Sequence, residues 1–125
     1  MEPIKPRIAV EYATNATIIT FTDEKILEEQ EISAIQDSIM SVIESAAGGV
    51  NLILDFSKVR FLSSAVLGLL IRVSKRVYQR NGQLRLCNIN PKIYEIFKIT
   101  RLTKIFDIYP DVESAGKGLP KPQRP

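Results

Sequence analysis

Two short segments near the start of the chain, residues 7–12 and 17–22, are rich in β-branched and aromatic side chains. The turn-like residues 14–16 separate them, which predicts an antiparallel β-hairpin. Over residues 28–47 the apolar positions follow a period of about 3.6 residues, with acidic residues on the opposite face, and this predicts an amphipathic helix. Residues 48–49 are both glycine, and we expect them to end the helix because glycine tolerates the left-handed conformation that often follows one.

Further along, short apolar runs alternate with amphipathic segments. Residues 51–57 are predicted to form a strand covered on both faces, because apolar residues are nearly continuous there. The elements predicted after it are a helix over residues 64–80, a strand over 83–89, a helix over 91–100 that begins after Asn90, a strand over 105–109 and a short helix over 110–115.

The predicted order is therefore ββαβαβαβα. Strands that alternate with helices run parallel and are joined by right-handed crossovers. This predicts the α/β class: a single small domain over residues 7–115, with a mixed, mostly parallel β-sheet flanked by helices. Residues 116–125 contain two glycines and three prolines and are expected to be a flexible C-terminal tail.

The residue inventory excludes most catalytic chemistry. The chain has 125 residues, no histidine and one cysteine, Cys87. Ser-His-Asp and Cys-His catalytic sets, imidazole metal ligands and internal disulfides are therefore excluded. We expect a non-enzymatic protein without cofactor or metal, in which Cys87 is a small core residue. The longest apolar stretch, residues 65–71, is too short to span a membrane, so we expect a cytoplasmic protein without membrane association.

The formal net charge of +3 conceals a segregation of charge along the chain. Residues 23–44 carry seven acidic side chains against one lysine, and residues 58–104 carry eleven basic side chains against one glutamate. Four of the basic residues recur on one face of the helix predicted over residues 64–80, and they are Arg72, Lys75, Arg76 and Arg80. This stripe fits either a solvated face or a surface for an acidic protein partner. Direct nucleic-acid binding is not expected, because the chain lacks a stacking aromatic array and a glycine-rich phosphate loop.

The junction between the predicted central strand and the next helix carries the candidate site. Ser63 and Ser64 lie at the start of that helix, beyond the carboxyl end of the strand, where sites in open α/β sheets concentrate. A serine there either caps the helix or carries a phosphate, which the free N–H groups and the helix dipole stabilise. Either role is compatible with these residue types alone.

The surrounding sequence resembles the STAS domain family, the fold of bacterial anti-sigma-factor antagonists. The resemblance covers about residues 7–115 and rests on NLILDFSKVRFLSSAVLGLLIRVSKRV followed by NGQLRLCNINPKIYEIFKITRLTKIFDIY. It implies that Ser63, with Ser64 as the fallback, is phosphorylated by an anti-sigma serine kinase of the histidine-kinase-like ATPase type. Binding to that kinase, and release on phosphorylation, are then the expected functions of a monomer or weak dimer.

The chain departs from the family pattern around these serines. Leu62 stands where the family has aspartate, Ala65 replaces a glycine, and the second glycine is displaced, with Leu67 in its place and Gly68 following. These departures keep a second hypothesis open: a phosphorylation-independent STAS scaffold, or a subunit of a signalling or lipid-transport complex. Asp55 is expected to support the strand end rather than perform chemistry.

Overall fold

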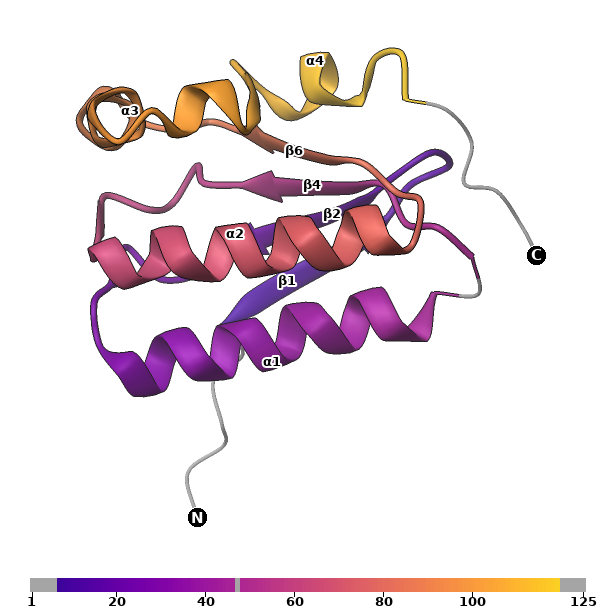
Figure 1. Ribbon diagram of the computed structural model, residues 1–125, viewed down its shortest axis with the longest axis horizontal. Coiled ribbons are helices and arrows are strands. Elements are labelled where there is room, and N and C mark those ends of the chain that lie inside the picture. Colours follow the sequence, from indigo (N-terminus) through magenta and orange to yellow (C-terminus); the bar gives the residue numbers. More distant parts are fainter. Residues whose placement is uncertain (1–6, 47, 120–125) are drawn as a thin grey trace.

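The computed structural model describes residues 7–46 and 48–119, which form a three-layer α/β domain around a five-stranded sheet (Figure 1). The strand order is β1-β2-β4-β6-β7; β1 pairs with β2 antiparallel, and every other pair is parallel. The strands of this sheet are β1 (Ile8–Tyr12), β2 (Thr17–Phe21), β4 (Leu52–Asp55), β6 (Leu84–Cys87) and β7 (Asp107–Tyr109). The predicted hairpin and the mostly parallel sheet are both confirmed.

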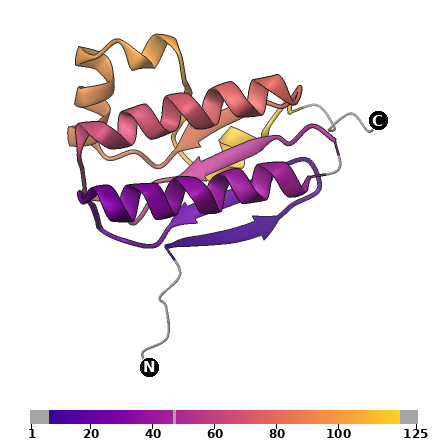
Figure 2. The ribbon, with the colours of Figure 1, turned by 60° about the horizontal axis from the view of Figure 1, so that its bottom comes forward.

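Helices cover both faces of the sheet. They are α1 (Glu29–Ser45), α2 (Ser64–Gln79), α3 (Pro91–Ile99), the 3₁₀ turn η1 (Leu102–Lys104) and α4 (Val112–Gly116). The two long helices α1 and α2 lie side by side on one face, while α4 packs on the other against β4, β6 and β7 (Figures 1 and 2). No helix within the described ranges combines the length and apolar character needed to cross a lipid bilayer.

The central strand β4 is buried along its whole length, as its nearly continuous apolar sequence predicts. Leu52 and Leu54 face the main core beneath α1 and α2. Ile53 faces a smaller apolar cluster under α4, where Cys87 is fully buried. Burial raises the pKa of the Cys87 thiol to about 12, which keeps it protonated, as befits a core residue.

The sequence analysis missed two strands and a turn. Strands β3 (Lys25–Ile26) and β5 (Phe61–Leu62) pair in parallel as a separate two-stranded sheet, and η1 precedes a last strand that starts at Asp107 rather than residue 105. Two-residue strands are too short to show a hydrophobic period, so only the backbone bonding of the folded chain reveals them. The observed order therefore contains the predicted elements with these three inserted.

The first helix ends at Ser45, and Ala46 after it is extended, so the left-handed glycine expected at residues 48–49 does not end it. Residue 47, where the first helix is predicted to end, lies outside the described residues, as do residues 120–125 of the predicted tail. In the described part of that tail, Gly116 completes α4 and Leu119 is buried in the cluster under it. Gly116 and Leu119 are therefore packed against the domain, whereas Lys117 and Gly118 are exposed.

Gly49 and Gly82 are required because other backbone atoms lie too close to them to admit a side chain, and not because their own backbone is left-handed. After α2 the left-handed residue is Asn81, with φ of 61°. A Cβ atom on Gly82 would lie 1.8 Å from the carbonyl oxygen of Val50, and one on Gly49 would lie 2.8 Å from that of Arg80. The turn after α2 thus crosses directly over the start of β4, and a side chain at position 82 has no space.

We therefore expect Gly82→Ala to lower the free energy of unfolding by at least about 2 kcal/mol, because backbone must move to admit the methyl group. Gly116→Ala is the matched control, since its Cβ would lie at an ordinary 3.9 Å from Ile53 Cδ1. This control is expected to change stability by less than about 0.5 kcal/mol. Urea denaturation followed by circular dichroism measures both, and equal stability of the two variants would contradict the close approach.

Candidate functional site

The candidate site is the N-terminus of α2 together with the loop that leads to it from β4. Ser63 is the N-cap residue and Ser64 is the first helical residue. Strand β3 and the residue before it hold the loop from one side: Arg60 N and Phe61 N donate to Glu24 O at 2.8 and 3.0 Å, and Ser63 N donates to the carbonyl oxygen of Ile26 at 3.0 Å. The backbone immediately before the serines is thereby bonded to a separate segment of the chain.

Asp55 supports the start of the same loop at the end of β4. Its Oδ1 accepts hydrogen bonds from Ser57 N and from Asn88 Nδ2, both at 2.9 Å, and its Oδ2 accepts a longer one of 3.4 Å from Thr20 Oγ1. Asn88 adopts a left-handed backbone with φ of 57°, a conformation that asparagine tolerates better than most residues. Asp55 therefore organises the carboxyl ends of three strands, which matches the supporting role expected from the sequence.

Asn90 holds the loop from the side opposite β3. Its Oδ1 accepts from Ile93 N at 2.9 Å and so caps α3, as the Asn-Pro signal predicts. Its Nδ2 donates to Val59 O at 3.1 Å and to Arg60 O at 3.3 Å. One side chain thus ties α3 to the loop before Ser63, a long-range role that the cap signal in the sequence does not reveal.

The two serines differ in their surroundings. The backbone carbonyl of Ser63 accepts from Val66 N at 3.0 Å, but its side chain makes no capping hydrogen bond. The Ser63 hydroxyl oxygen is buried and has no hydrogen-bond partner among the described residues. Ser64 is exposed. The cap role considered for Ser63 is therefore filled by its backbone only, and its hydroxyl is uncommitted.

The positions that depart from the family pattern are structurally ordinary. Leu62 is partly buried and packs against the main core, which a charged aspartate would not do. Ala65 is exposed in the first turn of α2, so its methyl group displaces nothing inside the domain. The first turn of α2 contains no acidic residue, and its backbone N–H groups and dipole create a positive potential beside the serines.

Three of the four basic residues predicted to bind a partner face α1. Arg72 Nε donates to Gln36 Oε1 at 2.8 Å, and Arg80 Nη2 donates to Ala46 O at 2.6 Å. Arg72 and Lys75 are both exposed, but no bond from Lys75 to α1 is seen among the described residues. The acidic first helix and the basic stripe, which are far apart in the sequence, are neighbours in space (Figure 2).

Glu44 is the centre of this contact between the two helices. It receives a two-pronged hydrogen bond from the Arg76 guanidinium, and Arg80 Nη1 lies 3.3 Å from its Oε2. The hydrogen bonding from Arg76 holds the pKa of Glu44 below its ordinary value, with the charges of Arg76 and Arg80 adding to the effect. One acidic side chain of α1 thus pairs with two of the four basic residues of the stripe.

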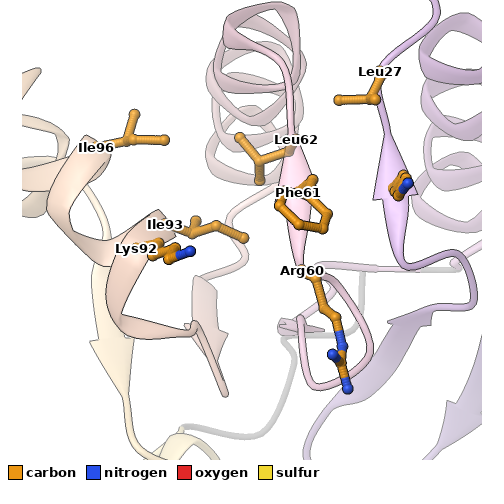
Figure 3. Close-up of a pocket in the computed structure, with 8 residues that line it drawn as sticks. Leu27, Arg60, Phe61, Leu62, Lys92, Ile93 and Ile96 are labelled. Atoms are coloured by element: carbon orange, nitrogen blue, oxygen red, sulfur yellow. The ribbon is translucent and has the colours of Figure 1, made fainter.

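A groove beside the serines is not evident from the sequence. It has a volume of about 430 Å³ and lies between β5 and the first two turns of α3. In Figure 3, Phe61 and Leu62 stand at its centre, with Leu27 on one side and Ile93 and Ile96 on the other. The groove depends on β3 and β5, the two strands that sequence reasoning missed.

Substitution of the two N-cap residues, Asn90 and Ser63, by alanine is expected to change the free energy of unfolding by different amounts. Asn90→Ala removes a cap bond and two loop bonds, so we expect it to lower the free energy of unfolding by about 1–2 kcal/mol. Ser63→Ala removes a hydroxyl that has no hydrogen-bond partner among the described residues, so a change below about 0.5 kcal/mol is expected in place of the usual cap penalty. Urea denaturation of both variants is the measurement. A loss on Ser63→Ala as large as that on Asn90→Ala would show that the hydroxyl does cap α2.

Comparison with known proteins agrees with this fold. Over 69 residues, which are 55% of the chain, it is 32% identical to BtrV of Bordetella bronchiseptica, a candidate anti-sigma factor antagonist. The aligned part spans 60% of the length of BtrV. An anti-sigma-factor antagonist (STAS) domain protein from Planctomyces limnophilus has a similar structure, with a TM-score of 0.78 at 23% identity, covering 86% of this chain and 93% of that one.

The Bacillus antagonist SpoIIAA, which has been solved in unphosphorylated and phosphorylated forms, shares the fold as well. Its unphosphorylated form gives a TM-score of 0.71 at 18% identity, with 86% of this chain and 91% of that one covered. The family model for the STAS domain matches residues 7–115, the range over which the sequence itself resembles that family. The chain is therefore a member of the STAS domain family.

Proposed function

We propose that this protein is an anti-sigma factor antagonist that binds an anti-sigma serine kinase and is released when Ser63 is phosphorylated. The observation that carries the proposal is the uncommitted hydroxyl of Ser63, at the N-terminus of α2, on a loop bonded from both sides. The names of its relatives support the same function, since BtrV and SpoIIAA are both described as antagonists. The protein acts in the cytoplasm, without a cofactor, as a monomer or weak dimer.

Phosphorylation at this position has a direct physical consequence. A phosphoserine carries a charge of about −1.5 to −2 at neutral pH, and the free N–H groups at the start of α2 stabilise it. The buried Ser63 hydroxyl must first rotate outward to reach the kinase. Because its side chain makes no cap bond, this rotation breaks no hydrogen bond among the described residues. Ser64, already exposed, is the fallback acceptor.

On α2, Lys75 is the basic residue most available to contact the kinase. Its ammonium is exposed, whereas the guanidinium groups of Arg72, Arg76 and Arg80 already bond to α1. The three arginines contribute through the potential of the stripe and through N–H groups that remain at its edge. Lys75 is therefore the α2 residue that we assign to direct binding of an acidic kinase surface.

A phosphorylation-independent scaffold, such as a subunit of a signalling or lipid-transport complex, is the second candidate. The specific observation in its favour is Leu62, which packs against the core where the family has an aspartate. Without that carboxylate the site lacks a group able to orient the serine or a metal-bound nucleotide. The two candidates differ in one respect that can be measured: phosphate transfer.

Incubation of the wild-type chain with ATP and each serine kinase of this type from the same genome is expected to add one phosphate, measured by intact mass spectrometry. Ser63→Ala is expected to abolish the addition, and Ser64→Ala, the matched control, to retain it. The reverse pattern would assign the phosphate to Ser64. Tight binding of a kinase to the wild-type chain without any added phosphate would contradict the switch and favour the scaffold.

A further inference from the structure

The groove beside Ser63 brings several exposed apolar side chains together. Leu27 and Phe61 are each 49% exposed, and Ile96 is 37% exposed. Exposed apolar surface costs roughly 25 cal/mol per Å² relative to burial, and apolar patches rimmed by polar residues mark interaction sites. The buried Ile93 forms the floor beside them. The groove therefore has the properties of a surface that is covered in a complex.

The rim of this groove is positively charged. Lys25, Arg60 and Lys92 line it, and none of the eight lining residues is acidic. Lys25 Nζ lies 5.6 Å from the centre of the Phe61 ring, at the side of the apolar patch. Arg60 Nε is 3.6 Å from Glu24 Oε1, but both side chains are more than half exposed, so this pair is weak and leaves the guanidinium accessible. Unlike the α2 arginines, these cations surround an apolar surface.

The groove is also continuous with the proposed phosphorylation site. Phe61 and Leu62 line it, and Ser63 follows them directly at the end of β5. A kinase that reaches the Ser63 hydroxyl must cover the adjoining backbone, and the groove lies next to it. Asn90 fixes the distance between the two walls, because it bonds to both α3 and the loop before β5.

We infer that this groove receives an acidic, amphipathic segment of the kinase partner, an inference that rests on the proposed function. Apolar side chains of that segment fill the space between Phe61 and Ile96, and its carboxylates face Lys25, Arg60 and Lys92. Such an arrangement places an apolar anchor in a pocket within a charged rim, the pattern typical of interface hot spots and of electrostatic selection among partners.

The same charges explain how phosphorylation releases this particular partner. A phosphate on Ser63 adds negative charge next to a surface that attracts carboxylates, so it repels the acidic segment and competes for the cationic rim. The protein's own tail does not fit the groove, since residues 116–125 carry three basic side chains and no acidic one. The cationic rim thus attracts the partner and also interacts with a phosphate on Ser63, which couples partner recognition to phosphorylation.

The test uses the kinase that phosphorylates or binds the wild-type chain, with its affinity measured by biolayer interferometry. Arg60→Glu combined with Lys92→Glu is expected to weaken binding about tenfold or more. Lys104→Glu combined with Lys117→Glu is the matched control, because it changes the net charge equally at exposed positions outside both the groove and the loop before Ser63. This control is expected to stay within about twofold of wild type. Thermal denaturation verifies that each variant is folded.

An apolar pair of variants tests the groove independently of charge. Ile96→Ala removes a side chain that lines the groove and is expected to weaken kinase binding about fivefold. Ile99→Ala, on the same helix but 75% exposed and outside the groove, is expected to leave it unchanged. Raising the salt from about 50 mM to about 500 mM should weaken wild-type binding but affect the Arg60→Glu, Lys92→Glu variant much less.

Three results would overturn the inference. Equal affinities for the groove variants and their controls would show that the partner docks elsewhere while the proposed function stands. A self-association of the free chain, seen by light scattering and lost in the groove variants, would show that a second copy occupies the groove. If no kinase binds or phosphorylates the wild-type chain, the proposed function fails, and the inferred partner fails with it.

Discussion

The site depends on the backbone bonding of one short loop. Between β4 and α2 the chain must leave a buried strand, cross the top of the sheet and deliver a serine to the start of a helix. Three N–H groups of residues 60, 61 and 63 bond to β3 or its preceding residue, and Asn90 bonds to the carbonyl groups of residues 59 and 60. This bonding from both sides gives the serines and the adjoining groove a defined geometry.

The packing of α1 against α2 determines which charged side chains are paired and which stay accessible. Glu44 accepts from Arg76 and pairs with Arg80, so one acidic side chain of α1 offsets part of the charge of the basic stripe. Accessible cations remain on Lys75 of α2 and around the groove, where the lining residues include no acid. The small net charge of +3 therefore does not describe the local surface, which is cationic both at the groove and on α2.

Sequence reasoning predicted the architecture because the core obeys simple periods. The helical period before residue 46 and the continuous apolar run of β4 both correspond to what packs inside. It could not predict β3 and β5, because two residues contain no period and their pairing uses only backbone groups. It also missed the second role of Asn90 and the pairing of Glu44, since both join segments more than 30 residues apart.

For the candidate site, too, local sequence predicts one part and tertiary structure determines the rest. The position of Ser63 at a helix start follows from local sequence, whereas the burial of its hydroxyl and the absence of a cap bond follow from the surrounding loop. The groove is wholly a product of long-range contacts, because its walls come from β3, β5 and α3. Local sequence thus indicates where the chemistry is, and tertiary structure determines what can reach it.

The loop before Ser63 is held by hydrogen bonds to Glu24 and Ile26, and amide hydrogen exchange measured by NMR tests this most directly. The amides of Arg60, Phe61 and Ser63, which donate to Glu24 and Ile26, are predicted to exchange at least about 100-fold more slowly than the same sequence in an unfolded peptide. Exchange of these three amides at the unprotected rate, while those of β4 stay protected, would contradict the account.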